Sequence, residues 1–531
     1  MSIYVIAYDV GTTGVKTCLF EISDKITLIE SSMAGYDLFV LENGGVEQEP
    51  EQWWKAMCLT TDVVMERSGI TRKAVAGISF CAQMQAVVMV DKNGEPVRRA
   101  MSYMDNRAET EMKKGIMSGI RISGLNAYKL LMSVLISGAV SASVKDPVWK
   151  YKWVENNEPE VFSRLYKWLD VKDFLVCRAS GKFVMSEDSA FATLLYDTRK
   201  GKKQFSRKLC RLMGVNYDHL PDVCKSTDQV GTITEKAAEE LGLAYGTPVF
   251  SGGGDASLIG VGAGAVLEAD THIYLGTSGW VSVVVKKQKL DINNMIASIV
   301  GANQGFFNYF AELETAGKCL EWVKDHLALD EIGLFLEKKH IWEDPESTYK
   351  NLYDFMMDSV KNVPAGSKGV MFTPWLHGNR CPFEDHYARG IFFNIGLETG
   401  KTEMIHSVVE GICYHLRWQL ESIDKNVKTL PVIRLVGGGA LAPLTCQILS
   451  DMLGREIETV ENPQDAGAVG AAITAAVGLR AIESIGASKS FIAPNKKYIP
   501  NKKNTEIYDS FFPVFKSLYK NNIKAFHILN K

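Results

Sequence analysis

Two aspartates of this chain combine a carboxylate with a glycine-rich setting at the end of a strand-like run. Asp9 follows the apolar run 4–8 directly, and Asp255 follows the glycines at 252–254. A carboxylate in such a place can hold a divalent metal ion through water or accept a proton from a hydroxyl. The structural alternatives are an Asx turn at Asp9 and a helix N-cap at Asp255, which would cap a segment through Gly262. Because the glycines at 252–254 have no other evident purpose in the sequence, we predict that Asp255 is a general base and that Asp9 and Asp255 are catalytic residues and metal ligands.

A second set of residues suits the binding of phosphate. The segments 9–14 and 275–279 are glycine- and threonine-containing turns, each between two strand-like runs. Glycines bring backbone N–H groups close to an anion, and threonine hydroxyls add donors. One such turn is a common hairpin, but two indicate two related halves that face one nucleotide, and the glycine run 437–439 supports this interpretation. The sequence therefore predicts an ATP-using phosphotransferase whose phosphate-binding residues are Gly11, Thr12, Thr13, Gly276 and Thr277.

Length and composition set the class of protein. The 531 residues exceed what one core holds, so we expect two domains, 1–257 and 258–531. The hydrophobic content of 46% is typical of a soluble globular protein, and the net charge of −3 argues against a nucleic-acid partner. The 10 cysteines are scattered, no apolar run is long enough to span a bilayer, and the N-terminus lacks the features of a signal peptide. We predict a cytoplasmic protein without a nucleic-acid or membrane partner, and whether it forms a homodimer is left open.

The elements that position these residues follow from hydrophobic periodicity and turn residues. We expect strands at 3–8, 15–21, 76–80, 87–90, 249–251, 273–275, 281–285 and 432–436. We expect helices at 50–67, 149–154, 167–177, 444–452 with a stop at Gly454, 465–477 with small residues for close packing, and 508–519. The Ser- and Gly-rich segment 133–143 is expected to be a loop that becomes ordered around a ligand.

In the order of its motifs the chain resembles the FGGY family of carbohydrate kinases. The segment 9–16 is similar to the family's first phosphate motif, 275–279 to its second, and 253–255 to the segment that bears the catalytic base. The segments 389–393 and 410–411 resemble the family's second signature. The residues that follow its first signature are Pro147, Lys150, Trp153, Val154 and Asn156.

The resemblance extends from residue 4 to about residue 479 and implies an α/β fold with two ribonuclease-H-like, actin-like ATPase domains that flank a catalytic cleft. The N-terminal domain would bind the sugar, and the C-terminal domain, with its closing helix, would bind the nucleotide. The implied cofactors are ATP and Mg²⁺. The resemblance adds to the nucleotide-binding set the residues Lys16, Gly317, Gly438, Gly439 and Ala440.

Within the family the chain is most similar to the xylulokinases, through the segments 47–54 and 83–84 and through Asp105. Gln85 stands where a xylulokinase usually has histidine, and Met104 alters an aromatic-Asn-Asp run. Both positions belong to the sugar pocket of that group. The resemblance implies a sugar-binding set of Gln83, Met84, Gln85, Asp105 and Asp255.

The implied reaction is transfer of the γ-phosphoryl group of ATP to the terminal hydroxyl of D-xylulose. The alternatives are a kinase for another ketose or a polyol and, from a different class of protein, an actin-like ATPase without a sugar substrate. A catalytically silent sugar sensor is disfavoured by the presence of Asp9 and Asp255.

Overall fold

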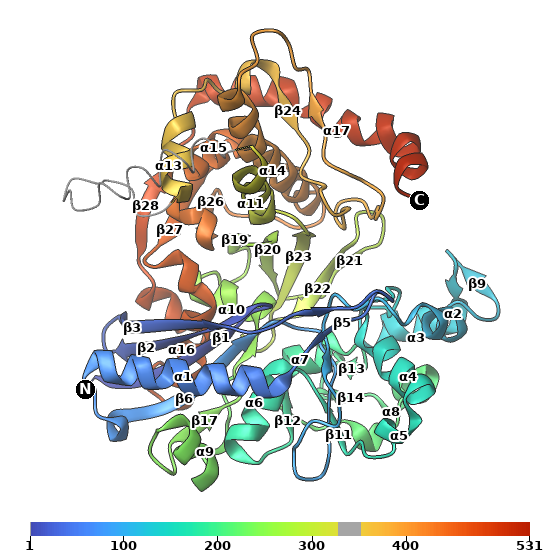
Figure 1. Ribbon diagram of the computed structural model, residues 1–531, viewed down its shortest axis with the longest axis vertical. Helices are drawn as coiled ribbons and strands as arrows, with labels where there is room; N and C mark the ends of the chain where they lie inside the picture. Colours follow the sequence, from blue (N-terminus) through green and yellow to red (C-terminus); the bar gives the residue numbers. More distant parts are fainter. Residues whose placement is uncertain (1, 328–351) are drawn as a thin grey trace.

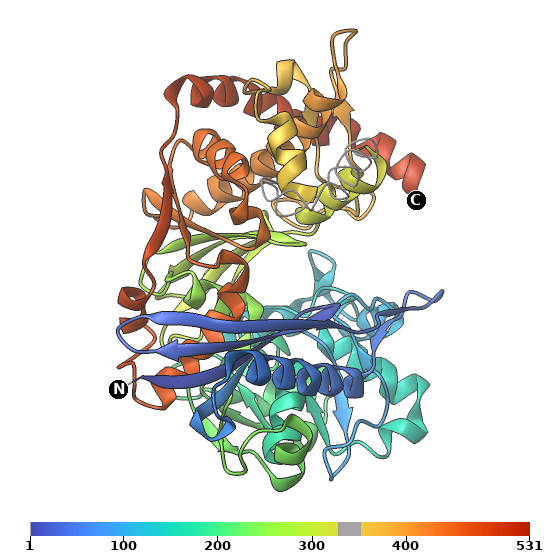
Figure 2. The same ribbon diagram turned by 60° about the vertical axis from the view of Figure 1, so that its left-hand side comes forward.

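The computed structural model describes residues 2–327 and 352–531. These residues form two lobes stacked along the long axis of the molecule, each built around a mixed sheet (Figure 1). Helices cover the faces of both sheets, so the predicted α/β class with two large domains is confirmed. Figure 2, turned by 60°, shows that the lobes are joined along one side.

The sheet of the N-terminal lobe is an antiparallel hairpin and a third antiparallel strand, followed by strands that run parallel to the first and by one antiparallel edge strand. Side chains of β1 (Ile3–Val10) alternate between its faces: Ile6 and Tyr8 pack on the side of α1 (Pro50–Ser68), and Val5 and Ala7 pack on the side of α16 (Ala466–Gly478). Asp9 continues the second series, so the alternation directs its carboxylate toward α16. In spatial order the strands are β3 (Ile26–Gly35), β2 (Gly14–Ile22), β1 (Ile3–Val10), β6 (Val75–Ala82), β17 (Pro248–Phe250) and β16 (Gln229–Thr232), with β18 (Gly253–Gly254) also beside β6.

The sheet of the C-terminal lobe repeats this plan. Counted along the chain, the core strands of both sheets have the order 3-2-1-4-5, with the first three antiparallel and the last two parallel to the first. The two related halves expected from the paired turns are therefore present. In spatial order the strands are β21 (Leu290–Asp291), β22 (Ile296–Val300), β23 (Phe307–Leu313), β20 (Gly279–Val285), β19 (Thr271–Leu275), β26 (Val432–Val436), β27 (Glu456–Val460) and β28 (Pro494–Tyr498).

Two helices join the lobes. α10 (Asp255–Gly262) packs against α16, which follows 200 residues later but lies on the N-terminal sheet. An added Cβ at Gly262 would lie 1.9 Å from the carbonyl oxygen of Ala466, and one at Gly470 would lie 2.2 Å from that of Leu258. The small residues of α16 thus allow the backbones to touch, as predicted. The proposed domain boundary after residue 257 falls inside α10 and stays a prediction.

Two predicted elements differ from the structure. The segment 167–177, expected to be one helix, begins as strand β11 (Lys167–Leu169), because Trp168 pairs with Met89 of β7 (Val88–Val90). The helix α6 (Val171–Ser180) starts only after Asp170, whose side chain accepts the N–H of Val171. The expected loop at 133–143 begins inside α3 (Ala127–Ile136), an apolar helix capped by Asn126.

The remaining elements complete the two lobes. Gly454 ends α15 (Pro443–Leu453) in the left-handed conformation (φ 60°), as predicted. None of the helices in the described part of the chain has the length and apolar character of a membrane span. All 10 cysteines are free thiols, most of them buried.

The other helices are α2 (Glu109–Gly115), α4 (Pro147–Asn157), α5 (Pro159–Phe162), α7 (Glu187–Ala192), α8 (Arg207–Met213), α9 (Glu235–Leu241), α11 (Gly317–His326), α13 (Leu352–Val360), α14 (Lys401–Asp424), α15 (Pro443–Leu453) and α17 (Lys502–Asn530). The short strands are β4 (Phe39–Val40), β5 (Val46–Gln48), β8 (Ala100–Met101), β9 (Arg121–Ile122), β10 (Leu125–Asn126), β12 (Val184–Ser186), β13 (Tyr196–Asp197), β14 (Gln204–Phe205), β15 (Asp222–Cys224), β24 (Met371–Phe372) and β25 (Phe392–Phe393).

Candidate active site

Three strands of the N-terminal sheet bring most of the predicted catalytic and sugar-binding residues together at the carboxyl ends of the strands. Asp9 of β1 pairs with Cys81 of β6, and Cys81 also pairs with Gly253 of β18. All three strands are parallel, so the segments that follow them start side by side. This register brings together Asp9, the segment 83–85 and Asp255.

The Asp9 carboxylate lies within β1, which continues to Val10, and it faces the start of α16. An added Cβ at Gly467 would lie 2.5 Å from Asp9 Oδ2, so only glycine fits there. Burial raises the pKa of Asp9 to about 6, although the nearby Lys16 ammonium and a hydrogen bond with Cys81 lower it. Asp9 therefore ionises near neutral pH, where it can bind a cation.

Lys16 lies directly across the hairpin from Asp9. Its Nζ is 2.6 Å from the Oδ1 of Asp465, which is buried, while the lysine side chain keeps 25% of its surface exposed. Burial lowers the pKa of Lys16, but the Asp465 carboxylate more than offsets this and raises it. The ion pair ties the first hairpin to the residues just before α16, and the predicted contact of Lys16 with phosphate stays a prediction.

Asp255 is the first residue of α10. The N-cap position belongs to Gly254, so Asp255 does not cap the helix, and its Oδ1 accepts only the N–H of Ala256, at 2.7 Å. Burial raises the pKa of Asp255 to about 7, helped by the charges of Asp9 and Glu312. A carboxylate with this pKa can accept a proton at neutral pH and release it again.

The glycines before Asp255 have a packing role that the sequence did not reveal. Gly252 has φ 65°, and an added Cβ there would lie 2.0 Å from the carbonyl oxygen of Phe80. An added Cβ at Gly254 would lie 2.2 Å from the sulfur of Met84. Gly252 is thus required by contact with β6 and Gly254 by contact with Met84, which follows β6. The catalytic prediction for Asp255 depends instead on its position and pKa.

The segment after β6 presents the predicted sugar-binding residues. The Gln83 N–H donates to the Val10 carbonyl at 2.9 Å, and its side-chain amide donates to Gln48 Oε1 at 2.9 Å. The Gln83 Oε1 is buried and has no hydrogen-bond partner among the residues that the structure describes. Gln85 adopts φ 66°, a conformation that side chains other than glycine rarely take. A turn at Met84–Gln85 therefore lies directly beside the strand end that carries Asp255.

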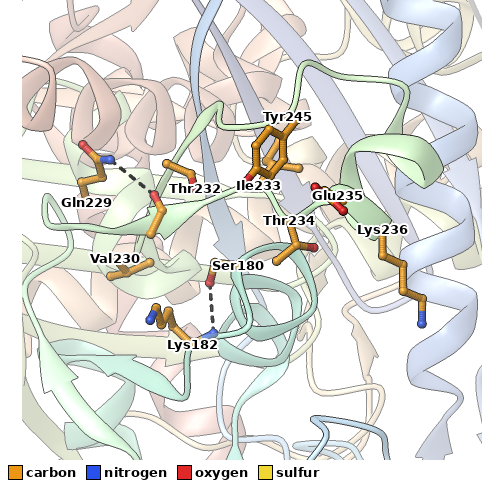
Figure 3. Close-up of a pocket in the computed structure, with 11 residues that line it drawn as sticks. Ser180, Lys182, Gln229, Val230, Thr232, Ile233, Thr234, Glu235, Lys236 and Tyr245 are labelled. Atoms are coloured by element: carbon orange, nitrogen blue, oxygen red, sulfur yellow. Dashed lines mark hydrogen bonds between the residues drawn. The ribbon is translucent and has the colours of Figure 1, made fainter.

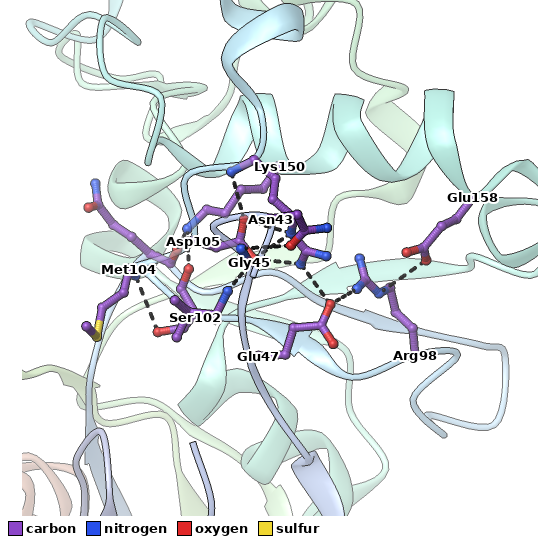
Figure 4. A network of polar contacts seen from close by, with 12 residues as sticks. Asn43, Gly45, Glu47, Arg98, Ser102, Met104, Asp105, Lys150 and Glu158 are labelled. Carbon is purple, nitrogen blue, oxygen red and sulfur yellow. Dashed lines mark hydrogen bonds and ion pairs between the residues drawn. The ribbon is translucent and has the colours of Figure 1, made fainter. Parts of the chain in front are cut away.

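Asp105 lies beside this turn but is completely buried. Its Oδ2 accepts the Val46 N–H at 2.9 Å and forms a 2.6 Å ion pair with Arg107, which also binds Glu47 (Figure 4). The carboxylate is thus engaged in an internal network. A contact between Asp105 and sugar stays a prediction.

The two phosphate turns have the expected form. In the first, the Gly11 N–H donates to the Gly14 carbonyl at 2.9 Å, and Thr13 is exposed. In the second, the Gly276 N–H donates to the Ser278 carbonyl at 3.0 Å, and Thr277 is exposed. The remaining turn residue, Thr12, has its hydroxyl 3.4 Å from that of Tyr103. Both hairpins thus expose a threonine at the tip, where a phosphate can reach it.

The predicted nucleoside-binding residues surround the second turn. The Gly317 N–H donates to the Gly276 carbonyl at 2.8 Å. β19 and β26 are parallel, with Tyr274 opposite Val436, so the turn after β19 lies beside the glycines after β26. Gly438 is exposed, and no atom lies within 4 Å of a Cβ added there, while Gly439 packs on Leu275. The remaining member of the set, Ala440, is buried in the core of the C-terminal lobe.

Residues of the C-terminal lobe also approach the two carboxylates. Burial raises the pKa of Tyr274, and the charges of Asp9 and Asp255 raise it further, so the tyrosine lies within electrostatic range of both. The Asn308 side chain donates to the carbonyl of Ala256 at 3.3 Å. The site thus draws on both sheets. The sequence did not mark Tyr274, Glu312, Asp465 or Gly467 as site residues, because they become neighbours of the two carboxylates only through the fold.

A surface hollow of about 610 Å³ lies elsewhere, along the edge strand β16 and the start of α9 (Figure 3). Its lining includes Ser180, Lys182, Gln229, Thr234 and Tyr245. None of the predicted site residues lines it, so this hollow is separate from the carboxylates and the phosphate turns.

Comparison with known proteins identifies the family. Residues 4–262 match the N-terminal domain of the FGGY family of carbohydrate kinases, and residues 272–479 match its C-terminal domain. The chain belongs to the FGGY family of carbohydrate kinases. It is therefore an ATP-dependent sugar kinase, and the alternative of an actin-like ATPase without a sugar substrate is set aside.

Individual FGGY relatives span the whole chain. A xylulose kinase of Lactococcus lactis is 29% identical over 99% of this chain and 98% of its own length. A gluconokinase of Bacillus subtilis is 25% identical over 98% of this chain and 96% of its own length. A ligand-bound xylulose kinase structure from Lactobacillus acidophilus superposes with a TM-score of 0.83 at 23% identity, covering 99% of both chains. This likeness confirms the fold, while the relatives differ in the substrate that their names give.

Proposed function

We propose that this FGGY kinase phosphorylates D-xylulose at its terminal hydroxyl. The observation that carries the proposal is the position of Asp255, a carboxylate with a pKa of about 7 that lies beside the Met84–Gln85 turn and near Asp9. Similarity to xylulose kinases over nearly the whole chain supports the choice of sugar.

Asp255 would act as the general base. Its carboxylate accepts the proton of the sugar hydroxyl while the hydroxyl oxygen forms a bond to the γ-phosphorus and the bond to the leaving ADP breaks. Because the Oδ1 of Asp255 is oriented by the Ala256 N–H, Oδ2 is the oxygen free to take that proton. The phosphoryl group ends on the sugar and the proton on Asp255.

The phosphate chain of ATP would lie between the two exposed turns. Thr13 and Thr277 supply hydroxyl donors, and the backbone of Gly11 and Gly276 allows close approach. Gly438 leaves room for the nucleoside on the C-terminal side.

Asp9 and Asp255 are the residues that would hold a magnesium ion. Mg²⁺ is typically bound by one or two carboxylates together with substrate phosphates rather than by an all-protein cage. When bound, Mg²⁺ neutralises the charge that develops on the phosphate oxygens.

Gluconate is the second candidate substrate, because gluconokinases are also similar over nearly the whole chain. Gluconate carries a carboxylate, which calls for a cation in the pocket. The ammonium of Lys150 already donates to two carbonyl groups, those of Gln85 and Ser102. The neutral amide of Gln85 suits a hydroxyl better than a carboxylate, which favours D-xylulose.

A substrate panel tests the proposal. ADP release is measured with ATP, Mg²⁺ and one of D-xylulose, D-ribulose, xylitol, glycerol or gluconate, with a reaction without sugar as control. We expect the highest kcat/KM with D-xylulose and little ADP without sugar. A higher kcat/KM with gluconate would overturn the choice of substrate, and equal ADP release without sugar would overturn the phosphotransfer itself.

A further inference from the structure

The turn at Met84–Gln85 is held in a conformation that its own sequence does not favour. Gln85 has φ 66°, a left-handed conformation that is strained for a residue other than glycine. The turn is also short. On one side the Gln83 N–H is hydrogen bonded to the Val10 carbonyl of β1, and on the other side Val87 forms a β-bridge with Met101. Contacts from outside the turn must therefore stabilise it.

One of these contacts is the carboxylate of Asp170, which is almost completely buried. Its Oδ2 accepts the N–H of Gln85 at 2.9 Å, and its Oδ1 accepts the N–H of Ala86 at 3.0 Å. The Oδ1 also accepts the N–H of Val171, which fixes the carboxylate at the start of α6. Two successive peptide N–H groups of the turn are thus bound to one carboxylate.

The other contact is the ammonium of Lys150, which has no exposed surface. Its Nζ donates to the carbonyl of Gln85 at 2.7 Å and to that of Ser102 at 2.8 Å (Figure 4). Ser102 begins the segment that leads to Asp105, so one lysine joins the two segments that carry predicted sugar-binding residues. A buried lysine or carboxylate is costly unless it is hydrogen bonded, and here backbone groups of the turn supply the bonds.

These contacts fix both peptide groups of Gln85, its N–H by Asp170 and its carbonyl by Lys150. The direction of the Gln85 side chain is then set by buried charges rather than by the turn itself. Met84 packs its sulfur against Gly254, directly before Asp255. The same contacts therefore fix the separation between the Gln85 side chain and the proposed base.

We propose that Lys150 and Asp170 are positioning residues that hold the Met84–Gln85 turn against the Asp255 strand end and thereby determine which sugar the kinase accepts. This inference depends on the proposed function, because it assigns Gln85 to the sugar pocket. It gives a physical role to Lys150, which the sequence resemblance marked only as part of a signature.

The test compares Lys150→Met with a matched control, Lys167→Met. The ammonium of Lys167 also donates to two backbone carbonyls, those of Asp218 and Leu220, neither of which belongs to the turn. For each variant, kcat and KM are measured with every sugar of the panel, together with the Kd for ATP without sugar and the melting temperature.

We expect Lys150→Met to lower kcat/KM for the preferred sugar by about 10²-fold, the effect of a displacement of about 1 Å, and to change the ranking of the sugars. The Kd for ATP should not change. Lys167→Met should leave the ranking intact even where its melting temperature falls. An unchanged ranking in folded Lys150→Met would overturn the inference, whereas a wild-type protein that phosphorylates no sugar would instead overturn the proposed function.

Two further variants keep the test decisive if Lys150→Met does not fold. Asp170→Asn retains the volume but can accept with only one oxygen, and it should change the ranking in the same direction. Gln85→Gly removes both the side chain and the need for a left-handed non-glycine residue. In a Gln85→Gly background, Lys150→Met should have no further effect on the ranking, and an undiminished effect there would show that Lys150 does not act through Gln85.

Discussion

Replacing Asp255 by asparagine should abolish most of the activity and, at the same time, stabilise the fold. Asparagine keeps the shape of the side chain but cannot accept the proton of the sugar hydroxyl. General-base catalysis is typically worth about 10²–10⁴-fold, so we expect a loss of at least about 10²-fold in kcat. The Kd for ATP should remain nearly unchanged, because the phosphate turns are intact.

The effect on stability follows from the pKa of Asp255, which rises from 3.8 to about 7 in the folded protein. Each pKa unit corresponds to about 1.36 kcal/mol, so ionised Asp255 would lower the free energy of unfolding by up to about 4 kcal/mol. The side chain is only partly shielded from water, and we therefore expect about 2 kcal/mol. The penalty is absent below about pH 3, where the carboxyl is protonated in both the folded and the unfolded chain. It grows as the pH rises through 3.8, because the unfolded chain ionises first, and it is complete above pH 7.

Melting temperatures of wild type and Asp255→Asn, measured from pH 5 to pH 8 without nucleotide and with a chelator, test this expectation. The variant should melt at a higher temperature, and the difference should increase with pH. Asp222→Asn, at an exposed aspartate, serves as the matched control and should melt like wild type at every pH. If Asp255→Asn keeps more than about a tenth of wild-type turnover, Asp255 is not the base; if it melts lower at pH 8, the carboxylate is not in the costly environment described.

Three further substitutions address other parts of the site. Thr277→Val should raise KM for ATP about tenfold, the value of a hydrogen bond to a charged group, and leave KM for sugar unchanged; a change confined to the sugar would refute its placement at the phosphate. Gln85→His should shift the preference among ketopentoses with the ATP parameters unchanged, and an unaltered ranking would remove Gln85 from the pocket. Gly467→Ala places a Cβ 2.5 Å from Asp9 Oδ2 and should lower kcat by about 10²-fold, whereas Gly396→Ala, with open space around the new Cβ, should not; equal activity of these two variants would contradict the position of Asp9.

The parts of the site that the sequence predicted are those with a local signal. Both phosphate hairpins combine a glycine turn with flanking β-branched runs, and the structure contains them at the expected places. The helix α16 was expected from its small residues, which indeed touch α10. Asp255 was predicted from its place beside a glycine run, although the structure shows that close contacts with Phe80 and Met84 already require Gly252 and Gly254.

The parts that the sequence could not predict depend on contacts between distant segments. Asp465 is 449 positions from its partner Lys16, and only the fold makes them an ion pair. The left-handed conformation of Gln85 is imposed by Lys150 and Asp170, which belong to other elements. The sequence does not predict this conformation, because the position is not a glycine. Likewise, Trp168 lies in a strand because it pairs with Met89, a preference that helical periodicity cannot reveal.

Phosphorylation of D-xylulose by this enzyme is tested most directly by proton-coupled ³¹P NMR of a reaction that contains ATP, Mg²⁺, D-xylulose and the enzyme. We expect a new phosphomonoester signal that is split by the protons of a CH₂ group, as for phosphate on the terminal carbon, and that is missing with Asp255→Asn. ATP consumption that yields only inorganic phosphate, or the same phosphomonoester at the same rate with Asp255→Asn, would contradict this expectation.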